Sequence, residues 1–465
     1  MSLKVVKIFP TRPIQARQVQ ATEAKRFASY KWPLSITIII AVTAAFSLSP
    51  LVDAVHPDAA VAGSLRTSLL YDLIAPVSNI LDSLTLLTPA QYWQTFALSA
   101  TIFFAWGIVR DGRERRGFSP VRVARATLRF LLGTVALIGI MLVVTRPMAA
   151  LNLSDKELIA VDFHSHTSAS HDGRPGFDAE HNRDWHRSAG FNVAYVTDHR
   201  TFDGALDAMR QNPATAGDGT VLLPGVELHD VGEHPLLLGV DPARMRITSP
   251  DWQDAAIKAD GGPVPPILLL TMPGELENIP ANELSGEVRI AGVEISDGCP
   301  RGMAQTATDH NLILALATKL NVATVAGSDN HGWGRTAPAW SALRIPGWRE
   351  MSPASLDSAI RSTIIAGRPG SALVIARRTA APSSGGVKSA LGGASVAFMM
   401  FRTMNARERL SWIVWSWSLV LFPSVRARVN RRRLRLAVRR RLRQRERRPL
   451  VDAAAAVQAS ASLSA

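Results

Sequence analysis

Four apolar stretches without a charged residue constrain the fold of this 465-residue chain most strongly. Each is 16 or 17 residues long, at the short end of the ~17–25 residues that cross a bilayer as a helix. They cover residues 34–49, 93–109, 130–145 and, with weaker hydrophobicity, 410–425. The first three fall within 112 residues and are flanked by Trp, Tyr and Arg, a combination that is hard to place in a soluble core. We therefore predict three transmembrane helices before residue 150 and a fourth near the C-terminus, with buried soluble helices as the alternative.

The positive charges predict how these helices are oriented. Residues 1–32 carry seven Lys and Arg, residues 110–129 carry seven Arg, and residues 426–448 carry thirteen Arg, whereas residues 50–92 carry one. Cytoplasmic loops are enriched in Lys and Arg, so the three basic segments are placed inside the cell. We expect an integral protein of the cell (inner) membrane whose large central domain lies on the outer, periplasmic side. If the fourth stretch were only interfacial, the Arg-rich tail would lie on the wrong side.

Charge and histidine also separate the centre of the chain from its ends. Residues 151–380 have a net charge of −9 and the remainder has +23, and ten of the eleven histidines lie between residues 164 and 331. The basic tail follows a predicted helix directly, so we expect it to bind anionic lipid of the inner leaflet rather than nucleic acid. The single cysteine, Cys299, excludes a disulfide framework and a cysteine-based zinc module.

These patterns predict the organisation of the chain. The outer loop contains leucine, valine and isoleucine at spacings of three and four from Leu69 to Leu87, which indicates an amphipathic helix interrupted by Pro76. The predicted parts are a basic cytoplasmic N-terminus (1–32), a membrane domain with three helices and this outer loop (33–150), the acidic domain (151–378), a linker (379–408), a fourth transmembrane helix (409–425) and an Arg-rich cytoplasmic tail with a disordered end (426–465).

The acidic domain alternates short apolar runs with helical stretches. Such alternation is typical of βα units and a mainly parallel sheet or barrel. We expect strands over 159–163, 193–197, 221–226, 236–240, 267–271, 290–295, 322–326 and 343–345, and helices over 178–188, 201–209, 303–320 and 355–365.

Histidines and carboxylates follow several of these runs at the point where each strand would end. Strand ends on one face of such a sheet converge on one mouth, so these side chains are expected to meet there. His164 and His166 alternate along one strand and should therefore point to the same side. Imidazoles mixed with carboxylates suit Zn, Mn or Fe better than Ca or Mg. The pattern predicts a divalent-metal site.

The segments that carry these residues resemble the motifs of the PHP domain (polymerase and histidinol phosphatase). The matching segments are HSHTSASHDG (164–173), YVTDHRTFDG (195–204), LLPGVEL (222–228), the segment around His234 and AGSDNHG (326–332). The resemblance covers residues 158 to about 367. It implies that 151–378 is a PHP-like metal-dependent hydrolase with a distorted (β/α)7 TIM-like barrel, fused here to transmembrane segments, and that two or three divalent metals support phosphoester hydrolysis.

The resemblance also implies the metal ligands of this chain. Glu227 is expected to bridge two metals, and Met272 stands in LLLTMPGE where the family commonly has a histidine ligand. A thioether is a poor ligand for such a site, so the third metal could be absent or held by other groups. The implied ligands are His164, His166, Asp172, His199, Glu227, His234, Asp329 and His331.

Other residues near these motifs are candidates for catalysis. Arg335 and then Arg200 are expected to neutralise phosphate charge, with a structural salt bridge as the alternative for each. His171 is a candidate for protonating the leaving group, with an exposed spectator as the alternative. His181, His186 and His310 lie in predicted helices and are expected to face solvent.

The predicted function is that of a membrane-anchored, outward-facing phosphoesterase that hydrolyses phosphate esters with a metal-activated water. The alternative is a weak or inactive domain that binds metal or phosphate and signals through the membrane helices. The expected partners are a phosphorylated substrate and the lipid bilayer, and nucleic acid is not expected as a partner.

Overall fold

The computed structural model describes residues 30–228, 234–245, 259, 262–271, 290–367, 370–382, 386–423 and parts of 425–437. Contacts between residues divide the chain into two units. One unit is Thr43–Glu408, and the other joins Met1–Val42 to Arg409–Ala465. The larger unit joins the outer loop and the helices before residue 150 to the acidic domain.

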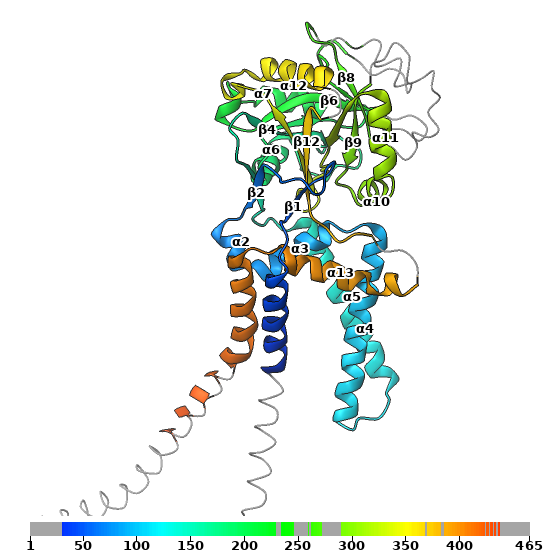
Figure 1. Ribbon diagram of the computed structural model, residues 1–465. Helices are drawn as coiled ribbons and strands as arrows, with labels where there is room; N and C mark the ends of the chain where they lie inside the picture. The colour runs from blue at the N-terminus through cyan, green and yellow to red at the C-terminus, as the bar shows by residue number, and fades with distance from the viewer. Residues whose placement is uncertain are drawn as a thin grey trace, which may run out of the picture. The chain divides into compact units, whose positions relative to one another are not determined.

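The centre of the larger unit is a ten-stranded sheet (Figure 1). Its strand order is β1-β12-β11-β4-β5-β6-β7-β8-β9-β10, and a separate hairpin joins β2 to β3. All eight predicted strands are confirmed. The strands of the sheet are β1 (Leu51–Asp53), β4 (Leu158–Ser165), β5 (Val193–Val196), β6 (Val221–Glu227), β7 (Leu236–Leu238), β8 (Ile267–Leu270), β9 (Ile290–Ser296), β10 (Ala323–Ala326), β11 (Ala339–Arg344) and β12 (Ala372–Arg377), and the hairpin strands are β2 (Gly63–Arg66) and β3 (Ala150–Leu153).

The expectation of a mainly parallel sheet is only partly correct. Four of the nine strand pairs within the ten-stranded sheet are parallel, namely β4 with β5, β5 with β6, β8 with β9 and β9 with β10. The other five are antiparallel, since β7 runs against both neighbours and β11, β12 and β1 extend the sheet beyond β4. The mixed α/β class is confirmed. The sheet curls so that Asn330, after β10, forms a bridge with Ser165 at the end of β4.

Alternation along the strands divides the apolar residues between two faces. Ile159, Val193 and Val221, near the beginnings of neighbouring strands, share one buried cluster with Leu356 and Ile360 of α12 (Pro353–Gly367). Helix α12 therefore closes the end of the sheet where the parallel strands begin. The other covering helices are α6 (Ala179–Ala189), α7 (Asp203–Arg210), α10 (Pro300–Thr308) and α11 (His310–Leu320), with short 3-10 turns η1 (Ala216–Asp218) and η3 (Trp348–Glu350).

The predicted amphipathic helix is present as two pieces. Helix α2 (Leu69–Leu73) ends where α3 (Ala75–Thr85) begins, with Pro76 in the first turn of α3, where a missing N–H costs nothing. The segment predicted as a linker, 379–408, contains the helix α13 (Gly386–Thr403). Apolar residues after the Pro- and Gly-rich start of this segment give α13 a face that packs on α4. Gly393 permits that packing, since a Cβ there would lie 2.9 Å from the Thr95 Cα.

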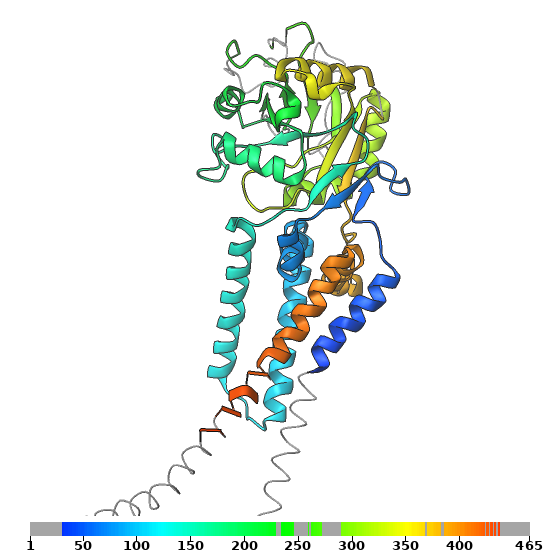
Figure 2. The ribbon, with the colours of Figure 1, turned by 90° about the vertical axis from the view of Figure 1, so that its left-hand side faces the viewer.

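Two helices among the described residues are long and apolar enough to cross a membrane, judged by length and composition. They are α4 (Pro89–Arg113) and α5 (Pro120–Val143), at the predicted second and third positions (Figure 2). Their apolar side chains are exposed on most sides, including Trp106, Ile108 and Val135. The helix Tyr30–Ala45, at the first predicted position, is shorter. A helix over 406–423 occupies the fourth.

The smaller unit contains most of these last two helices. The ring of Tyr30 stacks on the ring of Trp417 with centroids 6.2 Å apart, and the Trp417 indole Nε1 donates to the Thr37 hydroxyl at 3.1 Å. Residues before 30 and most of the Arg-rich tail lie outside the described part of the chain.

Candidate metal centre

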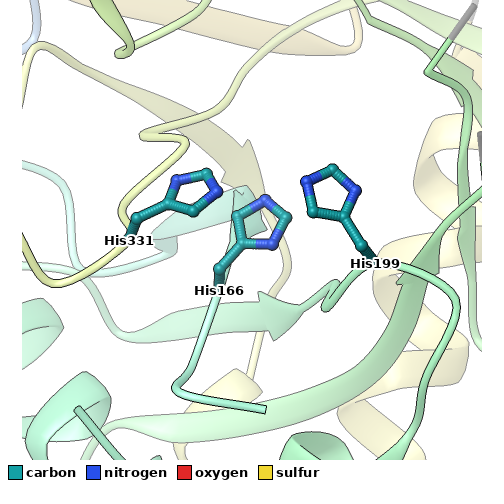
Figure 3. Close-up of side chains that lie close together, drawn as sticks. All are labelled: His166, His199 and His331. Carbon is teal, nitrogen blue, oxygen red and sulfur yellow. The ribbon is translucent and has the colours of Figure 1, made fainter. Parts of the chain in front are cut away.

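Three histidines from three separate strand ends lie side by side (Figure 3). His166 follows β4, His199 follows β5 and His331 follows β10. The ring centroid of His166 is 4.0 Å from that of His331 and 4.9 Å from that of His199. The His164 and His166 rings are 5.1 Å apart, which confirms that alternate residues of this strand point to one side.

Glu227, the last residue of β6, lies at the centre of the cluster. Its Oε2 is 3.1 Å from His164 Nε2, 3.2 Å from His166 Nε2 and 3.3 Å from His199 Nδ1. Its Oε1 is 2.8 Å from His234 Nδ1. One buried carboxylate therefore contacts four imidazoles, which is the arrangement expected of a residue that bridges two cations.

Asp329 and Asp172 complete the cluster from two loops. Asp329 Oδ1 is 3.3 Å from His164 Nε2 and 3.2 Å from His166 Nε2. Asp172 Oδ2 is 3.1 Å from His331 Nε2 and 3.3 Å from His199 Nε2. All eight side chains that the sequence selected as ligands thus lie in one connected cluster at the carboxyl ends of the parallel strands.

The charges of the cluster perturb one another. Burial lowers the pKa of His166, but the carboxylates of Asp329 and Glu227 outweigh it and raise that pKa to about 9. Burial raises the pKa of Glu227, but His164 and the other imidazoles hold it well below its usual range. Desolvation instead dominates at His199 and lowers its pKa to about 4. The site therefore gathers ionised carboxylates around imidazoles, the donor set of a transition-metal centre.

Orphaned nitrogen atoms test whether these residues fit a cation. Both ring nitrogens of His166 and the Nε2 of His331 are buried and lack a hydrogen-bond partner, although carboxylate oxygens lie within 3.2 Å of each Nε2. Buried polar atoms are normally paired. Nitrogen and oxygen atoms that converge without hydrogen-bond geometry fit ligands that share a metal ion.

Two buried carboxylates that sequence reasoning missed border the cluster. Glu294, in β9, places Oε2 3.4 Å from His164 Nδ1, and Asp297 follows the same strand. His164, Glu294 and Asp297 have ligand atoms within 4.8 Å of one another. The rule that selected the other ligands, a polar side chain after an apolar run, would have found Asp297, whereas Glu294 lies inside the run. Burial raises the pKa of Glu294 to about 7.

A second pair of residues that sequence reasoning missed, Asp162 and His186, joins β4 to α6 beside the cluster. Asp162 accepts a hydrogen bond from the Ser328 N–H at 2.8 Å, and its other oxygen lies 2.8 Å from His186 Nε2. The expectation that His186 faces solvent is therefore wrong, because the buried face of α6 carries it onto β4. His181 is exposed as expected, and His310 is partly buried.

Two of the three residues proposed for catalysis, Arg200 and His171, lie at the cluster, and Arg335 does not. Arg200, His171 and the ligands Asp172, His199 and His234 line an open pocket of about 370 Å³. Arg335 does not contact any cluster residue in the described contacts. Its guanidinium donates to the Arg146 carbonyl and the Ser188 hydroxyl, so the loop after His331 carries it toward α6 instead. Met272 lies outside the described residues.

Backbone strain is concentrated at the cluster. Four described residues other than glycine have positive φ, and two of them are Arg200 (54°) and Asp329 (44°). Such residues cost about 1–3 kcal/mol each and persist where the surroundings fix them. The Asp329 N–H donates to the His164 carbonyl at 2.9 Å, and the Arg200 N–H donates to the Glu227 carbonyl at 3.0 Å. Strand pairing thus holds both residues beside the cluster.

The raised pKa of His166 predicts an opposite pH dependence for the chelator-treated and metal-loaded protein. A folded pKa of about 9 against an unfolded value of ~6.5 stabilises the chelator-treated protein fully below pH 6.5, and this stabilisation is lost as pH rises to about 9. Metal binding requires deprotonated ligands, so the increase in Tm on adding Mn²⁺ should grow over the same range. Thermal unfolding between pH 6.5 and 9 measures both. A Tm that rises with pH in the chelator-treated protein would contradict this account.

Comparison with known proteins gives matches among solved structures alone. No family model and no curated protein matches the chain. PsfC from Pseudomonas syringae matches 53% of this chain and 99% of its own length at 16% identity, with a TM-score of 0.34. A two-domain protein from Bacteroides vulgatus containing a predicted PHP-like metal-dependent phosphoesterase matches 43% of this chain and 63% of its own, at 16% identity and a TM-score of 0.28. The lesion-specific endonuclease EndoQ from Pyrococcus furiosus matches 47% and 57%, at 13% identity and a TM-score of 0.33.

These similarities are too distant to carry a functional conclusion, which has to come from the site itself. The chain spans less than two thirds of the length of the Bacteroides and Pyrococcus proteins. Endonuclease Q has been crystallised with a 27-mer duplex that holds an abasic lesion at the active site.

Proposed function

We propose that this protein is a metal-dependent phosphoesterase of the PHP type that is anchored in a membrane. The observation that carries the proposal is the cluster in which Glu227 contacts four imidazoles while the His166 and His331 rings keep unpaired buried nitrogens. The motif resemblance supports the same activity, and the curled sheet with ligands at its strand ends supports a distorted (β/α)7 barrel.

Three groups of side chains would hold the cations. Two or three divalent ions bound there would supply an activated water and would withdraw charge from the phosphoryl oxygens. Glu227 belongs to the first and second groups, which makes it the bridging residue. The groups are His164, His166, Glu227 and Asp329; His199, His234 and Glu227; and Asp172, His199 and His331.

The remaining residues of the site bind and orient. Glu294 lies against His164 Nδ1, which leaves the His164 Nε2 directed at Glu227 and Asp329. Arg200 lines the open pocket, where its guanidinium would neutralise the charge of a bound phosphate. It takes this role in place of Arg335, whose guanidinium is bonded elsewhere. His171 is exposed in the same pocket with its ring 4.9 Å from that of His199, where it can donate a proton to a leaving alcohol.

The membrane part of the proposal rests on exposed apolar helices. Ile102, Trp106 and Ile108 of α4 and Leu132 and Val135 of α5 each expose about half of their surface or more. Soluble proteins rarely expose this much apolar surface, and where they do, it marks a site that contacts a membrane or another protein. With the charge distribution of the sequence, it supports an outward-facing domain anchored in the cell membrane and basic ends on the inner side.

Hydrolysis by the purified full-length protein tests the proposal. We expect turnover of bis-p-nitrophenyl phosphate with Mn²⁺, complete loss with chelator and recovery when metal is restored. The His164→Ala, His166→Ala double variant should lose both activity and bound metal, whereas His181→Ala, which removes an exposed histidine of α6, should keep both. Equal rates in the parent and the double variant would contradict the proposed phosphoesterase activity of this site. Stoichiometric metal without turnover of phosphomonoesters, phosphodiesters or duplex DNA would instead indicate a binding module.

A further inference from the structure

The open end of the metal site lies on the same side of the larger unit as the candidate membrane helices. Helix α12 contacts β6, β9 and β10, and it shares a buried cluster with Ile159, Val193 and Val221 near the beginnings of β4, β5 and β6. The ligands lie at the opposite ends of these strands. Helix α10, which follows β9 at the ligand end, contacts α4. Figures 1 and 2 agree, since both show α12 on the far side of the sheet from α4 and α5.

A short connection joins a metal ligand to the end of α5. The Gly334 N–H donates to the Leu142 carbonyl at 3.0 Å, and Leu142 lies in the last turn of α5. Gly334 is three residues after His331, so their Cα atoms are at most about 11 Å apart. If α5 crosses the membrane, the loop that carries His331 is therefore attached directly to the end of that span.

Exposed apolar side chains lie on the loop that makes this connection and on α2. Trp333, two residues after His331, has 44% of its surface exposed, and the Arg174 guanidinium lies 6.0 Å from its ring. Leu69, Leu70 and Leu73 of α2 expose 55–69% of their surfaces. Helix α3, which continues from α2, contacts α5. Amphipathic helices and exposed tryptophan at the end of a membrane helix are typical of the lipid–water interface.

We propose that the substrates of the site are phosphoesters of membrane lipids, hydrolysed at the membrane surface. The proposal rests on the phosphoesterase function proposed above and on α4 and α5 crossing the membrane. A lipid headgroup and a soluble substrate would present the same chemical group, a phosphate ester of an alcohol. A headgroup in the bilayer meets a site that faces the membrane, with Trp333 and α2 at the interface, whereas a soluble ester has to diffuse to it.

The first test compares lipid and soluble forms of the same ester. Full-length protein in vesicles containing phosphatidylglycerol and phosphatidic acid is assayed with Mn²⁺, beside glycerol phosphate and glycerophosphoglycerol in solution. We expect the lipid to be hydrolysed at least about tenfold faster at equal bulk concentration, because enzyme and substrate share one surface. Equal or faster hydrolysis of the soluble esters would overturn the lipid inference and leave the phosphoesterase standing. Absence of hydrolysis of every ester, bis-p-nitrophenyl phosphate included, would overturn both.

The second test measures depth without any catalysis. Cys299 is the only cysteine, and Cys299→Ser keeps a capping side chain at the start of α10. In that background a fluorophore is attached at Trp333→Cys or, as a matched control at the closed end of the sheet, at Arg349→Cys. Lipids with a quencher in the headgroup should quench the first label and not the second. Equal quenching, or none, at the two positions would overturn the placement of the site at the membrane.

Discussion

Replacing Glu227 by glutamine is expected to lower phosphodiester hydrolysis about 1,000-fold, equivalent to about 4 kcal/mol of transition-state stabilisation. The carboxylate contacts four imidazoles at 2.8–3.3 Å, and an amide of the same shape removes the negative charge that two cations would share. The pKa of Glu227 is held well below its usual range, so the residue is ionised over the whole working range of pH. The variant should also bind less metal, which elemental analysis of the dialysed protein measures.

The matched control for this prediction is Glu180→Gln. Glu180 is an exposed carboxylate of α6 without a contact to the cluster among the described interactions, so its variant should keep parental activity and metal content. A Glu227→Gln protein with unchanged metal content and a rate within tenfold of the parent would show that Glu227 does not bridge cations. Circular dichroism and Tm establish that the variant remains folded.

Replacing Asp82 by alanine is expected to reduce the free energy of unfolding by about 3–5 kcal/mol, since it leaves buried arginines without their counter-charge. Asp82 of α3 is 4% exposed. Its carboxylate lies 2.5 Å from the Arg146 guanidinium and 3.1 Å from that of Arg377, and it accepts from the Tyr71 hydroxyl at 2.8 Å and the Thr336 hydroxyl at 2.9 Å. Chemical unfolding of the protein in detergent measures the change.

The Asp82 contacts also connect the outer loop to the metal site. Thr336 lies five residues after His331, in the loop after β10 that we call the ligand loop, and Arg146 follows α5. The aspartate therefore joins α2, α3 and β12 to the ligand loop. Asp82→Asn removes the charge but keeps the shape, and it should show most of the loss of stability. Asp58→Ala, at an exposed position of the same outer loop, should change stability by less than about 0.5 kcal/mol. Similar stability of the Asp82 and Asp58 variants would refute the role of this network.

Local patterns in the sequence were sufficient to locate eight of the twelve described strands and the residues proposed as ligands. Strands such as β5 and β8 are continuous apolar runs buried on both faces, and such runs stand out in any sequence. The proposed ligands follow such runs closely. The carboxyl ends of parallel strands lie at the same edge of a sheet or barrel, whatever the rest of the fold is. The length and apolar composition of α4 and α5 were equally visible, because both can be read directly from the residues.

Other features depend on which surfaces meet, and the sequence does not contain that information locally. His186 looked like a solvent-facing helical histidine, but its position on the buried face of α6 brings it to Asp162. Arg335 is close to His331 in sequence, yet the loop turns it toward Arg146 and Ser188. The helix α13 over the expected linker likewise packs on α4, which lies far away along the chain.

The sequence by itself determined the kind of chemistry, a set of imidazoles and carboxylates at strand ends, and the presence of long apolar helices. These properties are written in residue type and spacing, which short-range geometry converts directly into structure. Only the tertiary structure decided that Glu227 lies between four imidazoles, that Glu294 lies behind His164 and that the ligand loop is bonded to α5. Side chains hundreds of residues apart become neighbours only when the buried faces of the sheet and helices are packed together.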